Sequence, residues 1–142
     1  MADKNTDKLM NELKSDKDIN RFLTENAAYM RDLNFTQYLA GIMAQKNLSI
    51  KELSDRSGIS YSYVYHIVKG DKTPGRLKML AIAFGLGATL DETQQMLRQA
   101  RLSLLYPRDR WDAVIITALQ QRLSVMEANE LLEKLGETVF LV

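Results

Sequence analysis

Residues 48–70 have the sequence LSIKELSDRSGISYSYVYHIVKG. Ser49 and Glu52 are spaced as a capping box, in which the hydroxyl accepts a hydrogen bond from a helical amide and the carboxylate accepts one from the amide of the cap residue. Gly58 can adopt the positive φ that ends such a helix in a sharp turn. The stretch is therefore predicted to begin with a short helix over residues 50–57.

A second short helix is expected after the turn, over residues 61–69. Ser60 can cap this helix, and Val64 and Ile67, three residues apart, supply its buried side. Ile59 would fill the corner between the two helices. In such a pair the second helix projects from the surface of the domain, as a helix that enters the major groove of DNA must.

The stretch resembles the helix-turn-helix family of phage repressors and Xre-like proteins. That family pattern has a polar cap, a leucine, a turn glycine followed by an aliphatic residue and a serine, an aliphatic pair, a glycine and, four residues later, a proline. The chain matches these positions with Ser49, Leu53, Gly58, Ile59, Ser60, Val64, Ile67, Gly70 and Pro74. The resemblance covers residues 35–100 and implies a lambda-repressor-like fold and a transcriptional regulator that binds double-stranded DNA.

The resemblance also implies which side chains contact DNA. The exposed face of the second helix would read bases, and it comprises Tyr61, Ser62, Tyr65, His66 and Lys69. Serine and histidine can donate or accept at base edges, and tyrosine rings can contact thymine methyl groups. Phosphate contacts are expected from Lys51, Lys72 and Arg76, with Arg56 as a further candidate.

The tyrosines of this helix leave a second interpretation open. Tyr61, Tyr63 and Tyr65 lie within five residues, and tyrosine is common at the centres of protein–protein interfaces. An arginine or glutamine on this face would have favoured DNA more strongly. The alternative function is a protein–protein interaction adaptor that keeps the helix-turn-helix fold without binding DNA.

Charge is distributed unevenly along the chain. The net charge is +1, but residues 35–88 carry seven basic and three acidic side chains, a net charge of +4. A cationic segment is the electrostatic signature of a polyanionic partner. An ordinary solvated surface could also carry a net charge of +4. The charge therefore agrees with the DNA-binding function that the motif implies, but does not establish that function alone.

Apolar residues recur at spacings of three and four throughout the chain, which predicts an all-α protein. Three regions are expected: an N-terminal helical extension (1–34), the helix-turn-helix domain (35–100) and a C-terminal helical region (101–142). Outside the motif, helices are expected over residues 18–33, 35–46, 75–84, 90–100, 107–121 and 125–135, with one or two weak turns before Ser15. Further capping boxes start at Thr89 and Ser124.

Three details are expected at the level of single residues. Pro107 suits the first position of a helix. Gly85 and Gly87 are expected to break the chain between two helices. Arg108 and Asp112 are spaced for an exposed ion pair on the first turn of a helix.

The C-terminal region has too much apolar surface for a solvated tail. Trp111 begins one apolar stripe, and Leu131, Leu132 and Leu135 form another. These stripes must be buried against the middle of the chain or against a second copy. Helix-turn-helix proteins commonly dimerise, so residues 101–142 are expected to form a homodimer or to dock a partner protein.

Composition excludes several other classes of protein. The 142 residues contain no Cys and a single His, which excludes disulfides, thiol catalysis and sites built from several cysteines or histidines. We expect no metal, no cofactor and no enzymatic activity. The first residues lack the apolar core of a signal peptide, and no apolar run approaches the length of a membrane span, so a cytoplasmic protein is expected.

Overall fold

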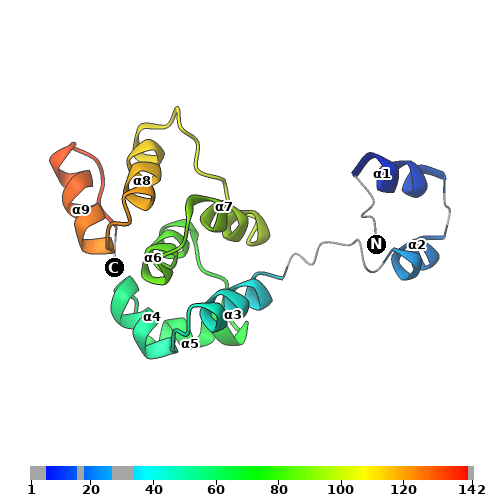
Figure 1. The fold of residues 1–142 in the computed structure, drawn as a ribbon, viewed down its shortest axis with the longest axis horizontal. Coiled ribbons are helices and arrows are strands. Elements are labelled where there is room, and N and C mark those ends of the chain that lie inside the picture. The colour runs from blue at the N-terminus through cyan, green and yellow to red at the C-terminus, as the bar shows by residue number, and fades with distance from the viewer. Residues whose placement is uncertain (1–5, 16–17, 27–33, 141–142) are drawn as a thin grey trace. The chain divides into compact units, whose positions relative to one another are not determined.

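The computed structural model describes residues 6–15, 18–26 and 34–140. These residues form α-helices joined by turns and loops, with no strand among them, which confirms the all-α prediction. The chain divides into two compact units, residues 1–33 and 34–142. Figure 1 shows the helices of both units.

The first unit contains α1 (Thr6–Ser15) and α2 (Ile19–Glu25). The prediction of one helix over residues 18–33 is wrong, because α2 ends at Glu25. Asn26 follows it, and the side-chain amide of Asn26 donates to the carbonyl oxygen of Phe22 at 3.0 Å. Asparagine side chains compete in this way with the backbone bonds that would continue a helix. Residues 27–33 lie outside the described part of the chain.

The described residues of the second unit contain seven helices. These are α3 (Phe35–Gln45), α4 (Ile50–Ser57), α5 (Tyr61–Lys69), α6 (Arg76–Leu86), α7 (Leu90–Gln99), α8 (Arg110–Gln120) and α9 (Val125–Lys134). The capping boxes predicted at Ser49, Thr89 and Ser124 are all formed, each with the glutamate three residues later. Local hydrogen bonds therefore determine where α4, α7 and α9 begin.

Helix α6 is central to this unit. Its residues 79–86 are all buried, and it packs against α4, α7 and α9 (Figure 1). A helix that is apolar on all sides is typical of the interior of a helical domain. Leu39, Leu53, Ile67 and Met96 are fully buried side chains of the surrounding helices.

The C-terminal helices extend the same core. Ile115 of α8 and Leu132 of α9 are fully buried and belong to the cluster built around α6. Phe140 packs edge-on against Phe84 of α6 and against Trp111 of α8, with ring centroids 5.7 Å apart in both pairs. The apolar stripes of residues 101–140 are thus largely buried against the middle of the chain.

Gly85 does not break the chain as predicted, because it lies inside α6 and is buried. The helix continues to Leu86 and ends at Gly87, which has a φ of +65°. A Cβ atom on Gly85 would lie 3.0 Å from Cδ1 of Leu53 and 3.1 Å from the backbone nitrogen of Ser57. Glycine at this position therefore allows the backbone of α4 to approach α6 closely.

Helix α8 begins at Arg110, so the prediction that Pro107 starts it is wrong. Pro107 is instead the second residue of a turn in which the amide of Asp109 donates to the carbonyl oxygen of Tyr106 at 3.0 Å. Proline favours this position of a turn because its φ is already suitable. Asp109 then caps the helix by accepting a bond from the amide of Asp112 at 2.9 Å.

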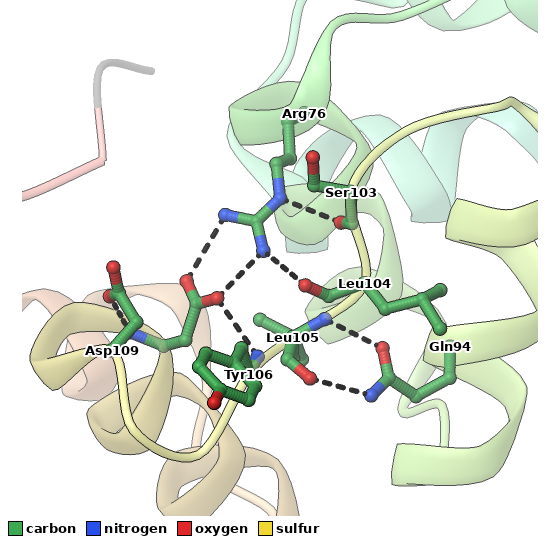
Figure 2. Close-up of polar contacts among 8 residues, drawn as sticks. Arg76, Gln94, Ser103, Leu104, Leu105, Tyr106 and Asp109 are labelled. Carbon is green, nitrogen blue, oxygen red and sulfur yellow. Dashed lines mark hydrogen bonds and ion pairs between the residues drawn. The ribbon is translucent and has the colours of Figure 1, made fainter.

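A partly buried ion pair joins α6 to α8 (Figure 2). The guanidinium of Arg76 donates to both carboxylate oxygens of Asp112, at 3.1 and 2.9 Å, and Asp112 is only 5% exposed. The same guanidinium donates to the carbonyl oxygens of Ser103 and Leu104. The expected exposed pair between Arg108 and Asp112 is therefore wrong, because the carboxylate is buried and bonded elsewhere.

The connection between α7 and α8 is held by side chains from three helices. Gln94 of α7 accepts from the amide of Leu105 at 2.8 Å and donates to its carbonyl oxygen at 3.0 Å. Asp112 of α8 accepts from the amide of Tyr106 at 3.0 Å. Arg76 of α6 donates to the carbonyl oxygens of Ser103 and Leu104 (Figure 2). These side chains thereby satisfy backbone groups of the connection that lie outside any helix.

Substituting the buried glycine tests the close contact between α4 and α6. We expect Gly85→Ala to destabilise the protein by about 1–2 kcal/mol, because the overpacking cost exceeds the gain in helix propensity. Gly41→Ala is the matched control: Gly41 is an exposed position inside α3, with no atom near the added methyl group. It should stabilise by about 0.5–1 kcal/mol. Urea unfolding measures both; equal stabilisation by the two variants would contradict the close contact.

Removing one partner of the partly buried ion pair tests its contribution. We expect Asp112→Ala to destabilise by about 2–3 kcal/mol, because it leaves the Arg76 guanidinium without its carboxylate. Asp109→Ala, which removes only a helix cap, should cost about 1 kcal/mol. Adding Arg76→Met to Asp112→Ala should cost at least about 1 kcal/mol less than the sum of the single changes. Strict additivity in thermal unfolding would show that the two groups act independently.

Candidate nucleic-acid interface

Helices α4 and α5 meet at a turn built from serine and glycine residues. Gly58 has a φ of +76°, as the sharp turn requires, and its amide donates to the carbonyl oxygen of Ser54. The hydroxyl of Ser54 donates in turn to the carbonyl oxygen of Ile59. Ser60 caps α5 by accepting from the amide of Tyr63 at 3.3 Å. The predicted helix, turn and second helix are therefore formed at the predicted residues.

One side of α5 is anchored in the core. Val64 and Ile67 are fully buried, as is Leu53 of α4, and Ile59 at the corner is 4% exposed. Because these residues set the rotation of α5 about its axis, the opposite side of the helix is directed outward.

The five residues predicted to read bases share this outward side. They are Tyr61, Ser62, Tyr65, His66 and Lys69, of which Tyr65 is half-buried and the other four are exposed. Their spacing of one and four residues follows one face of a helix. The structure thus brings together all five base-contact candidates.

Lysine side chains lie over the tyrosine rings at this surface. The Nζ atoms of Lys72 and Lys78 lie 4.5 and 3.8 Å from the ring centroid of Tyr63, and Nζ of Lys69 lies 5.2 Å from that of Tyr65. These distances are typical of cation–π contacts. A hydrogen bond with Tyr65 raises the pKa of the Lys69 amine above its ordinary value.

Lys78 is a member of this surface that sequence analysis missed. It lies on α6, nine residues after the end of α5, and no motif position of the family pattern includes it. The only available signal is the cationic excess of residues 35–88, to which Lys78 contributes. Its place beside Tyr63 depends on how α6 packs, which the spacing of residues does not reveal.

His66 has an acidic neighbour just beyond the helix. Nδ1 of His66 lies 3.2 Å from a carboxylate oxygen of Asp71, and the chain reaches Asp71 through Gly70, with a φ of +89°. When Nδ1 donates to this carboxylate, Nε2 is the nitrogen that remains for another partner. Asp71 therefore orients the imidazole ring.

The side chains predicted to contact phosphates differ in the contacts that they make within the protein. Lys51 forms an exposed i,i+4 pair with Asp55 at 3.2 Å, and Arg56 lies 4.0 Å from Glu52; exposed pairs of this kind are weak and readily exchanged. Arg76 is not part of the surface of α5, because its guanidinium is committed to Asp112 and to two backbone carbonyl groups.

Residues 39–92 match the family model described as Helix-turn-helix, which represents the Xre- and lambda-repressor-like proteins. The middle of this chain is a helix-turn-helix domain. The match runs from α3 into α7 and confirms the resemblance inferred from the sequence. Domains of this family are found in DNA-binding transcription regulators. The chain has no significant match among curated proteins or solved structures.

No group of three or more His, Asp or Glu side chains within the described ranges could hold a metal ion. None of the helices described is both long and apolar enough to cross a membrane.

Proposed function

We propose that this protein is a sequence-specific DNA-binding transcription regulator whose helix α5 enters the major groove. One observation carries the proposal: within a helix-turn-helix domain, the outward side of α5 bears the polar and aromatic side chains, while Val64 and Ile67 anchor its other side. A protein with this function would act inside the cell, where the DNA is.

Base recognition is assigned to the outward side of α5. Ser62 and His66 can form hydrogen bonds with base edges, and Tyr61 and Tyr65 can contact thymine methyl groups. Asp71 supports the orientation of the His66 ring through its contact with Nδ1. Lys69 at the end of the helix would reach a base edge or a nearby phosphate.

Phosphate binding is assigned to the lysines around the helix. Lys51 and Lys72 were expected from the sequence, and Lys78 joins them because it shares the ring of Tyr63 with Lys72. Arg76 is left out of the proposed contacts, because binding phosphate would break its partly buried pair with Asp112.

The salt dependence of duplex binding tests these contacts. About four phosphate contacts per protomer predict a fall in log affinity with log salt of slope about −3 to −4. Lys72→Gln should reduce the steepness by about 1, whatever the DNA sequence. Lys134→Gln, the same charge change on α9, is the control and should leave the slope unchanged. Equal effects of the two variants would refute the assignment of Lys72.

Sequence preference tests the base contacts separately. A selection of binding sites from a random duplex library should yield a defined motif for the wild-type protein. The double substitution Ser62→Ala and His66→Ala should relax this motif while the salt slope stays the same, because it removes base contacts and no phosphate contact. An unchanged motif would contradict the role given to these side chains.

The adaptor alternative rests on the exposed tyrosine at the start of α5. Tyr61 is 54% exposed, and an exposed tyrosine is a common anchor of protein interfaces. Absence of binding to any duplex in the library at low salt would favour this function over DNA recognition.

We also propose that the C-terminal helices form a homodimer. A groove of about 370 Å³ runs between α8 and α9, lined by residues that include Val114, Leu131 and Leu135, and Leu135 is 43% exposed. Two-fold pairing would present two α5 helices to half-sites about 34 Å apart.

Sedimentation of one groove variant tests the dimer. Leu135→Glu should convert the protein to a monomer, because it introduces charge into the apolar groove. Met126→Glu is the matched control: Met126 is 72% exposed on α9 but does not line the groove, so this variant should dimerise like the wild type. A wild-type protein that stays monomeric at high concentration would overturn the proposal.

A further inference from the structure

A cavity of about 270 Å³ lies where α4 and the end of α6 meet the α8–α9 connection. Its lining includes Arg56, Phe84, Ala88, Leu119, Arg122 and Leu123. A neighbouring hollow of about 240 Å³ shares Leu119 and Arg122 with it. The size is close to the lower end of the range for small-molecule sites.

The floor of the cavity is apolar and firmly packed. Phe84, Ala88 and Leu119 are each at most 7% exposed, and Leu123 is half-buried. The ring of Phe84 is held from behind by the edge-on contact with Phe140. Such a floor suits the hydrocarbon part of a ligand.

Two arginine residues line the cavity, Arg56 and Arg122. Arg56 comes from α4 and has Glu52 as its nearest carboxylate, at 4.0 Å with both side chains at least half exposed, so this pair is weak. The side chain of Arg122 has no hydrogen bond or ion pair among the contacts of the described residues, whereas its backbone amide donates to the carbonyl oxygen of Leu119 at 3.1 Å. Glu127 also lines the cavity, but one of its oxygens is used by the capping bond from the amide of Ser124, at 3.0 Å.

The backbone of Arg122 is unusual for an arginine. Its φ is +56°, at the end of α8, where glycine is the preferred residue. Arg101, just after α7, has a similar φ of +59°, whereas Gly58, Gly70 and Gly87 occupy the corresponding positions at the ends of α4, α5 and α6. The chain thus carries a cation at a position where glycine would be the more stable choice.

We propose that this cavity binds a small organic carboxylate with an apolar body. The hydrocarbon part would pack on Phe84, Ala88, Leu119 and Leu123, and the carboxylate would be bound by the guanidinium groups at the rim. Guanidinium groups bind carboxylates through paired, charge-assisted hydrogen bonds. Because two cations and an apolar floor act together, neither a simple inorganic anion nor a neutral hydrocarbon satisfies both parts of the site.

Titration with octanoate, followed by amide NMR of the full chain, tests this site. We expect saturable shifts centred on the amides of Gly87, Ala88 and Leu123. Octan-1-ol, which has the same chain length without the charge, should bind at least tenfold more weakly. Binding of octanol as tight as that of octanoate, or shifts centred on the α8–α9 groove around Leu135, would overturn the proposal.

Three variants identify the groups that bind the carboxylate. Arg56→Gln and Arg122→Gly should each weaken octanoate binding at least fivefold. Arg122→Gly should also unfold at an equal or higher temperature, because glycine is favoured at its φ, so lost binding cannot be blamed on lost folding. Arg108→Gln, an exposed arginine outside the cavity, is the control and should bind normally. Wild-type affinity in both cavity variants would refute the assignment.

Discussion

The close approach of α4 to α6 is the contact on which the rest of the domain depends. Gly85 has no side chain, and the atoms that face it are Cδ1 of Leu53 and the backbone of Ser57. This contact sets how far α4 lies from the central helix. Helix α5 is joined to α4 by a short turn, and its buried residues lie in the same core as Leu53 of α4. The orientation of α5 therefore depends on the same contact between α4 and α6.

Two further devices determine which side of α5 is outward. Val64 and Ile67 are buried on one side of the helix, and the serine bonds at the turn hold its first residues. Lys78 of α6 and Lys72 of the segment after α5 then lie over the ring of Tyr63. The candidate interface is therefore a product of core packing and is not a property of α5 alone.

Much of the fold could be predicted from the sequence because its signals are local. A capping box spans four residues, and the serine that caps α5 lies directly before that helix, so α4, α5, α7 and α9 begin where expected. The exposed face of α5 was predictable for the same reason, since Val64 and Ile67 indicate the buried side.

The parts that could not be predicted depend on residues far apart in the chain. Arg76 and Asp112 are 36 residues apart, so nothing near either residue reveals their pairing, and Arg76 resembled a free surface cation. Gly85 resembled a helix breaker because the need for close packing against α4 is invisible in its own neighbourhood. Lys78 was missed because its contact with Tyr63 requires the packing of α6 to be known.

The position of Phe140 has a consequence for genetics. Its ring lies in the same cluster as Phe84 and Trp111, and Trp111 also donates to the carbonyl oxygen of Thr138 at 2.7 Å. A premature stop codon after the family-matched residues would therefore expose the core of the helix-turn-helix domain itself. Alleles that lack the last helices would therefore behave as loss of the whole protein. They would not leave a folded DNA-binding domain that fails only to dimerise.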